Sequence, residues 1–154
     1  MKGLSTLKIV VVALFAALIC VATMIVQIPL PATGGYANLG DGIILICVFL
    51  LDPLSAVIAA GLGSALADVL AGYISFAPGT LLIKAGVALI AALAFNRLSK
   101  NASEKKAFAA MIVAGLLAEA FMVVGYFLYE AMILGIGLGA AGSIVGNIGQ
   151  SVVA

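Results

Sequence analysis

The sequence predicts an all-α integral membrane protein, a compact bundle of six transmembrane helices with both termini in the cytoplasm. Three observations predict this fold class. The chain of 154 residues is 66% hydrophobic and only 8% charged, and its mean hydropathy is +1.37. Its uncharged segments are long enough to cross a bilayer. The ten-residue alternating segments that are typical of a membrane β-barrel do not occur. We expect residues 1–154 to form a single transmembrane domain.

Hydropathy and helix-breaking residues place the six helices. The first ends before Pro29, since proline cannot continue a helix. The third begins at Asp52-Pro53, an N-cap residue followed by proline at the first helical position. The expected ranges are about 8–28, 39–51, 53–72, 79–95, 107–129 and 140–154. The sixth range is still apolar where the sequence stops, which is consistent with a truncated last helix.

The second segment is short, because thirteen residues rise only roughly 20 Å against a hydrocarbon core of about 30 Å. The positive charges nevertheless predict that it crosses. With six crossings, six of the seven cations lie on one side, and the opposite loops 29–41, 73–78 and 130–139 contain none. Five crossings would split the cations between both sides, against the positive-inside rule. The six cations are Lys2, Lys8, Arg97, Lys100, Lys105 and Lys106.

The first loop, residues 29–41, is polar and rich in glycine and proline. Its glycines let the backbone approach a ligand, and Tyr36, Asn38 and Asp41 offer stacking, donor and acceptor groups. Two interpretations stand side by side. The loop binds a ligand, or it is a capped turn in which Asp41 is the N-cap of the next helix.

Polar residues inside the apolar segments predict a pocket beneath this loop. Lys84 and Asp68 lie at similar depths, so we expect a buried ion pair, although either residue could also contact a ligand. The fifth and sixth segments each carry several polar residues on one helical face. A single polar residue usually bonds a neighbouring helix, whereas polar faces on four helices favour a cavity that opens outward. The further residues expected in the outer half are Thr80, Tyr126, Glu130, Ser143 and Asn147, whereas Glu119 and Gln150 are expected deeper in the membrane.

Several functional classes are disfavoured by the composition. The chain has no histidine and no acidic or cysteine spacing of metal-site type, so we expect no metal, and Cys20 and Cys47 are expected to be buried. No phosphate-binding loop of the G-x-x-x-x-G-K-[ST] type is present, so the chain cannot hydrolyse ATP by that means. A net charge of +1 provides no basic face for nucleic acid. We expect neither an enzyme nor a bound cofactor.

Pairs of small residues four positions apart predict close helix packing. Gly61 with Ala65 and Gly142 with Gly146 are expected to pack within the chain. For Ala13 with Ala17 in the first segment, packing against another subunit is a rival interpretation.

Three motifs carry a resemblance to a known family. Residues 35–41 (GYANLGD), 61–68 (GLGSALAD) and 77–84 (APGTLLIK) resemble the S component of energy-coupling factor (ECF) vitamin transporters. The branch that it resembles most closely includes hydroxymethylpyrimidine and pyridoxine carriers, and the resemblance covers about residues 8–150. It implies a bacterial plasma-membrane subunit of an ABC importer that binds one vitamin near the extracellular side. Its implied partners are a membrane coupling protein and two ATPase subunits.

The resemblance also implies roles for particular residues. Ala13 and Ala17 match the pair that docks on the coupling protein. The implied cycle is binding of a small heteroaromatic molecule from outside, closure of residues 29–41, and ATP-driven release inward. The main rival is an autonomous proton-coupled transporter that uses Glu119, and a third interpretation is a purely structural membrane subunit. The substrate-binding positions implied are Tyr36, Asn38, Asp41, Lys84, Glu119, Tyr126, Asn147 and Gln150.

Overall fold

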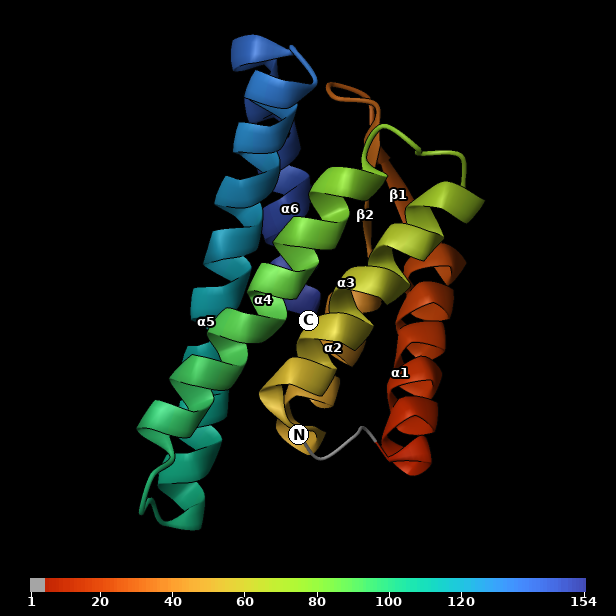
Figure 1. The fold of residues 1–154 in the computed structure, drawn as a ribbon. Helices are drawn as coiled ribbons and strands as arrows, with labels where there is room; N and C mark the ends of the chain where they lie inside the picture. The colour runs from red at the N-terminus through yellow and green to blue at the C-terminus, as the bar shows by residue number, and fades with distance from the viewer. Residues whose placement is uncertain (1–4) are drawn as a thin grey trace.

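The computed structural model of the protein describes residues 5–154, so Lys2 lies outside the described residues. It contains six α-helices and one β-hairpin (Figure 1). A π-helical turn, η1 (Tyr129–Ile133), extends α5, and a 3-10 turn, η2 (Gly137–Ala140), precedes α6. The other elements are α1 (Thr6–Ile25), β1 (Gln27–Leu30), β2 (Gly35–Asn38), α2 (Gly40–Leu50), α3 (Pro53–Leu70), α4 (Ala77–Leu98), α5 (Glu104–Leu128) and α6 (Ala141–Val153).

The predicted six-helix fold is confirmed. Within residues 5–154, four helical segments are long and apolar enough to cross a membrane, namely α1, α3, α4 and α5 with its π-helical extension, and α2 is a shorter apolar helix. The predicted N-cap of α3 is also present, because the Asp52 side chain accepts a hydrogen bond from the Ser55 backbone nitrogen at 3.3 Å. Helix α6 starts near the hairpin, and Ala154 lies part-way along the bundle (Figure 1).

The two ends of the bundle differ in character. At one end, which we call the basic end, lie the start of α1 and the α2–α3 and α4–α5 connections (Figure 1). This end holds Lys8 and the cations of residues 97–106, and Lys8 Nζ lies 3.0 Å from Asp52 Oδ2. At the other end, the hairpin end, lie the β-hairpin, the α3–α4 connection and the two turns η1 and η2. The described cations other than Lys84 therefore gather at one end, as the charge pattern predicted.

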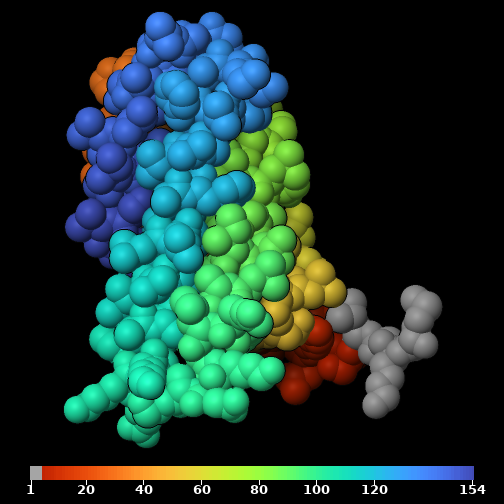
Figure 2. Space-filling model, turned by 90° about the vertical axis from the view of Figure 1, so that its left-hand side faces the viewer, coloured from red at the N-terminus to blue at the C-terminus, as the bar shows by residue number. Residues whose placement is uncertain are grey.

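Small residues hold the helices close together. A Cβ on Gly63 of α3 would lie 2.5 Å from the Ala16 carbonyl oxygen of α1, and one on Gly61 would lie 3.0 Å from the Leu81 carbonyl oxygen of α4. Gly142 and Gly146 of α6 similarly meet the hairpin, at Ala32 and Leu30. The packing within the chain that was predicted for the Gly61 and Gly142 pairs is confirmed. In Figure 2 the neighbouring helices α4 and α5 lie tightly against each other over most of their length.

The first loop differs from the prediction, because most of it is a β-hairpin. Strands β1 and β2 pair antiparallel, with Gln27 opposite Asn38 and Leu30 opposite Gly35. Helix α1 therefore ends at Ile25, before the extended residues begin. The turn between the strands includes Gly34 at φ +70°, a conformation that glycine adopts without steric cost. The hairpin contacts α1 and α6 and covers the hairpin end of the bundle (Figure 1).

Candidate ligand-binding site

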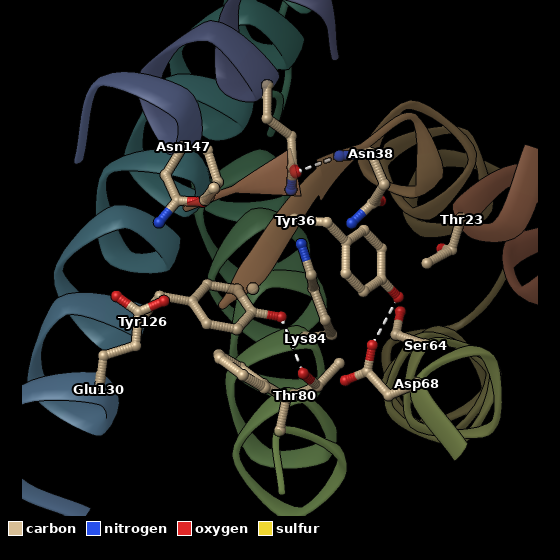
Figure 3. A pocket seen from close by; sticks show the side chains of 14 residues that line it. Thr23, Tyr36, Asn38, Ser64, Asp68, Thr80, Lys84, Tyr126, Glu130 and Asn147 are labelled. Atoms are coloured by element: carbon tan, nitrogen blue, oxygen red, sulfur yellow. Dashed lines mark hydrogen bonds between the residues drawn. The ribbon is translucent and has the colours of Figure 1, made fainter. Parts of the chain in front are cut away.

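A small polar cavity lies between the hairpin and helices α1, α3, α4, α5 and α6 (Figure 3). Its volume is about 20 Å³, which is room for roughly one water molecule. Any larger ligand therefore requires the surrounding side chains or the hairpin to move. The lining residues are Thr23, Leu30, Gly35, Tyr36, Asn38, Ser64, Asp68, Phe76, Thr80, Lys84, Tyr126, Glu130, Asn147 and Gln150.

A buried ion pair forms the floor of the cavity, on the side that faces the basic end. Lys84 Nζ donates to Asp41 Oδ1 at 2.6 Å and to Asp41 Oδ2 at 2.7 Å. Both side chains are almost completely buried, at 2% and 0% exposure. Gln150 Nε2 also donates to Asp41 Oδ2, and Gln150 Oε1 accepts from the Asn38 backbone nitrogen at 2.6 Å. These bonds connect the hairpin, α2, α4 and α6 at a single point.

The predicted ion pair between Asp68 and Lys84 is therefore wrong. Lys84 pairs with Asp41, and Asp68 Oδ1 instead accepts from the Tyr36 hydroxyl at 2.6 Å. Equal depth did not identify the partner, because Asp41 in the first turn of α2 lies at the same level. Burial, followed by the hydrogen bond to Asp68, raises the pKa of Tyr36 above its ordinary value, so its hydroxyl keeps its proton.

The capped-turn interpretation of the first loop needs a similar correction. Asp41 lies inside the first turn of α2 and is not its N-cap. The Asn38 side chain supplies the bond at the helix start, because its Oδ1 accepts from the Gly40 backbone nitrogen at 2.9 Å. Asn38 thus uses its side-chain oxygen and its backbone nitrogen to fix the end of β2 above the ion pair.

Four buried polar atoms on the cavity wall have no hydrogen-bond partner among the described residues: Thr23 Oγ1, Ser64 Oγ, Asp68 Oδ2 and Asn147 Nδ2. Buried polar side chains in folded proteins are nearly always hydrogen-bonded. Leaving such a group unsatisfied costs about 1–3 kcal/mol. The wall thus presents unused acceptors and donors to whatever molecule enters.

The hairpin-end part of the cavity is built by α4, α5 and the π-helical turn. Thr80 Oγ1 and the Tyr126 hydroxyl lie 3.0 Å apart, and the Lys84 ammonium lies 5.4 Å from the Tyr126 ring centroid. Glu130 in η1 is buried and accepts from Ser143 Oγ on α6. Extra residues in a π-helical turn shift the side chains that follow, and such turns are frequent at functional sites.

Six of the eight residues predicted to bind substrate line the cavity: Tyr36, Asn38, Lys84, Tyr126, Asn147 and Gln150. Asp41 lies directly beneath it as the partner of Lys84. Thr23, Ser64 and Phe76 line the cavity as well but were not predicted there, whereas Asp68, Thr80 and Glu130 were expected among the polar residues of the pocket. Thr23 is a lone hydroxyl group in an apolar helix, where the sequence offers no signal that separates a ligand contact from ordinary helix packing. Ser64 lies four residues before Asp68, and this spacing is the one sequence signal that could have placed it at the site.

Glu119 does not reach the cavity. It lines a separate groove of about 420 Å³ between α2, α5 and α6. It shares a helical face with Tyr126 but lies seven residues earlier, which is roughly 10 Å along the axis. Met122, about one turn after Glu119 on α5, contacts Gln150 Nε2 of the cavity wall through its sulfur at 4.0 Å.

Comparison with known proteins identifies the family. The family model described as "ECF-type riboflavin transporter, S component" matches residues 3–154 of this chain. The chain belongs to the S-component family of ECF-type transporters. A relative from Pyrococcus woesei, described as "Uncharacterized protein in gap 3'region", is 37% identical over 134 residues, which are 87% of this chain and 84% of the relative.

A solved structure has the same fold. It is described as "Structure and mechanism of the S component of a bacterial ECF transporter", and its TM-score to this chain is 0.67 at 19% sequence identity. The match covers 95% of this chain and 87% of the other. At this level of identity the likeness shows the fold alone.

Family membership confirms the S-component prediction. S components are substrate-binding membrane subunits of ECF transporters and are not enzymes. Membership also implies association with a coupling module that consists of a membrane protein and ATPases. The predicted hydroxymethylpyrimidine and pyridoxine branch is not confirmed, since the matching family model is named for riboflavin.

Proposed function

We propose that this S component captures a vitamin or vitamin precursor with a flat, polar heteroaromatic ring from outside the cell. It then delivers this molecule to a coupling module whose ATPase subunits provide the energy. The observation that supports this proposal is the cavity at the hairpin end, where aromatic side chains stand beside buried polar atoms that have no partners. A flat heteroaromatic molecule matches both features, because its faces contact aromatic rings while its edge forms hydrogen bonds.

Riboflavin is the first candidate substrate, because the matching family model carries its name. Hydroxymethylpyrimidine and pyridoxine are the second, because the three sequence motifs resemble carriers of those compounds. All three molecules exceed the cavity volume of about 20 Å³. Binding therefore includes a movement, and the hairpin is the element best suited to it. A two-stranded hairpin has little stability of its own, so it can leave α6 and return without disrupting the helices.

The basic end faces the cytoplasm in this proposal, since loops rich in Lys and Arg stay on that side of the plasma membrane. The cavity then opens outward beneath the hairpin. Helix α1 starts on the cytoplasmic side, and α6 runs from the outside toward it. This orientation places the substrate site where an importer first meets its substrate.

Ala13 and Ala17 on α1 form the proposed docking surface for the coupling protein. Both side chains are exposed, whereas Ala16 on the neighbouring face packs against Gly63 of α3. Beside Ala13 lies an apolar groove of about 310 Å³ between α1 and α3. Small side chains let a partner helix approach closely in a membrane, where packing rather than hydrophobic burial drives association.

Substrate identification tests the proposal most directly. The protein is purified in detergent, and any small molecule that co-purifies with it is extracted and identified by mass spectrometry. It is then titrated with riboflavin, pyridoxine and hydroxymethylpyrimidine by isothermal titration calorimetry. We expect one of the three to bind, and we expect Asn147→Ala to weaken that binding. Absence of binding by all three would contradict the proposed substrate class.

A second experiment, which measures uptake in cells, distinguishes this proposal from an autonomous proton-coupled carrier. We expect cells that lack the coupling protein and ATPases to bind the vitamin but not to accumulate it. Glu119→Gln should leave accumulation intact when the partners are present. Accumulation without partner subunits, abolished by Glu119→Gln, would favour the autonomous carrier.

A further inference from the structure

We propose that Asp68 on α3 anchors a hydrogen-bond donor of the substrate, and that Ser64 and Thr23 complete this subsite. The carboxylate selects molecules that present an N–H or O–H group at this edge. The inference rests on the proposed substrate-binding function and deepens it. It adds α1 and α3 to the binding elements, whereas the family resemblance pointed to the first loop, α4, α5 and α6.

One carboxylate oxygen of Asp68 accepts a hydrogen bond, and the other does not. Oδ1 accepts from the Tyr36 hydroxyl, while Oδ2 is buried and has no partner among the described residues. The residue is only 3% exposed and lines the cavity. A carboxylate oxygen accepts hydrogen bonds, so Oδ2 is available to a donor from a molecule in the cavity.

In the part of the chain that the structure describes, no positively charged side chain on the cavity wall donates to Asp68 Oδ2. Lys84, the one cation on the cavity wall, directs its ammonium group at both oxygens of Asp41. The wall also carries a second carboxylate, Glu130, which already accepts from Ser143. The cavity thus favours a neutral or positively charged ligand group beside Asp68 and disfavours an anionic one.

Two hydroxyl groups extend the subsite. Ser64 lies one turn before Asp68 on the same face of α3. Its Oγ is buried without a partner, and so is Thr23 Oγ1 on α1. Figure 3 shows Thr23, Ser64 and Asp68 on one side of the cavity, with Tyr126 and Asn147 on the other. Asn147 Nδ2 is an unused donor, so the two sides suit a molecule with donors along one edge and acceptors along the other.

A purely structural role for Asp68 makes a different prediction. Holding the Tyr36 hydroxyl needs only one acceptor oxygen, which an asparagine also provides. Asp68→Asn keeps that bond and replaces the carboxylate's free acceptor with an NH₂ donor. If Asp68 only positions Tyr36, this variant should bind the substrate like the wild type.

The test measures the affinity of purified Asp68→Asn for whichever of riboflavin, pyridoxine and hydroxymethylpyrimidine the wild type binds. We expect binding to weaken about tenfold to a hundredfold, the cost of losing a charged acceptor in a desolvated site. The matched control is Glu119→Gln, which changes another buried carboxylate with unpartnered oxygens outside the cavity. Its affinity should stay within twofold of the wild type.

Ser64→Ala is the second variant, because it removes only the hydroxyl oxygen of a small residue. It tests the subsite if Asp68→Asn does not fold. We expect it to weaken binding by roughly threefold to tenfold. Wild-type affinity in a folded Asp68→Asn, or in Ser64→Ala where Asp68→Asn does not fold, would overturn the subsite. Failure of the wild type to bind any of the three vitamins would instead overturn the proposed function, and the subsite with it.

Discussion

Asp41 and Lys84 place opposite charges deep inside the bundle, and their surroundings explain how the protein tolerates them. The ammonium reaches both carboxylate oxygens, and Gln150 donates an additional hydrogen bond to Asp41. Desolvating two charges is expensive, and only good geometry with further hydrogen bonds compensates for it. The pair also connects four elements beneath the cavity, so it fixes the shape of the cavity as well as its charge.

Removing the charge of one partner should therefore lower the stability of the protein more than removing both charges. We expect Lys84→Met to lower the free energy of unfolding by about 3–5 kcal/mol, because Asp41 is left buried without its counter-charge. The double variant Asp41→Asn with Lys84→Met should recover most of this loss. Thermal unfolding in detergent measures both effects.

Two control variants test whether the effect is specific to the pair of Asp41 and Lys84. Combining Lys84→Met with Asp68→Asn should bring no recovery, because Asp41 remains charged and alone. Lys8→Met breaks the exposed pair with Asp52, whose side chains are 36% and 47% exposed, and should change stability by less than about 1 kcal/mol. A Lys84→Met variant as stable as the wild type would show that the pair contributes nothing.

At the residue scale, the sequence predicted how deep a side chain lies in the membrane but not which neighbouring helix it faces. Counting residues from a helix end gives depth, so Lys84, Tyr126 and Asn147 were expected near one level, and all three line the cavity. The partner of Lys84 depends on how the helices are rotated and tilted, and apolar segments without a strong polar face leave that rotation open. The assignment of Glu119 to the substrate came from the family resemblance; in the structure Glu119 lines a separate groove, although it shares a helical face with Tyr126.

At the element scale, the helices followed from hydropathy and from Pro and Gly breakers. The hairpin did not. Its strands have four residues each, one contains a proline and the other a glycine, and neither shows the alternation that predicts a strand. They pair because residues 27–38 pack against α1 and α6, which is a tertiary effect. The π-helical turn at Tyr129–Ile133 likewise has no marker in the sequence.

The contact between α1 and α3 depends on the missing side chain of Gly63. A Cβ there would meet backbone atoms of Ala16, at 2.5 Å from its carbonyl oxygen and 3.0 Å from its Cα. Backbone cannot move aside as a side-chain tip can, so we expect Gly63→Ala to destabilise the protein by about 1–3 kcal/mol. Thermal unfolding in detergent measures the change.

Gly42 on α2 is the matched control, because a Cβ there meets nothing within 4 Å. Gly42→Ala should be neutral or stabilising by up to about 1 kcal/mol, since alanine favours the helix. Equal effects of the two substitutions would contradict a role for close α1–α3 approach.

The exposed face of α1 should matter for transport and not for substrate binding. We expect Ala13→Leu and Ala17→Leu to keep wild-type affinity for the vitamin but to abolish uptake by the complete transporter, because a bulky side chain keeps the partner helix away. Calorimetry on the purified subunit and uptake in cells measure the two properties separately.

Ala120→Leu provides the control, because Ala120 is exposed on α5, away from α1. It makes the same change of side chain and should leave uptake intact. Normal uptake in both α1 variants, or equal loss of binding and uptake, would refute the docking assignment.

The whole molecule is asymmetric along its length. Its described cations other than Lys84 gather at the basic end, and its polar cavity lies at the hairpin end (Figures 1 and 3). The ion pair closes the cavity on the side that faces the basic end. In the proposed function a small molecule enters at the hairpin end, so the direction of the subunit in the membrane determines the direction of capture.

That direction can be tested with single cysteines in intact cells. Ser75 lies in the α3–α4 connection at the hairpin end, and Ser103 lies in the α4–α5 connection at the basic end; both are exposed. The native Cys20 and Cys47 are buried and should give little background. We expect a membrane-impermeant thiol reagent to label Ser75→Cys from outside and to label Ser103→Cys only after the cells are opened. This expectation follows from the proposed orientation, in which the basic end lies in the cytoplasm. Labelling of both positions from outside would refute the six-crossing arrangement. Labelling of Ser103→Cys alone would reverse the orientation, and the cavity would then open toward the cytoplasm, which is incompatible with capture from outside.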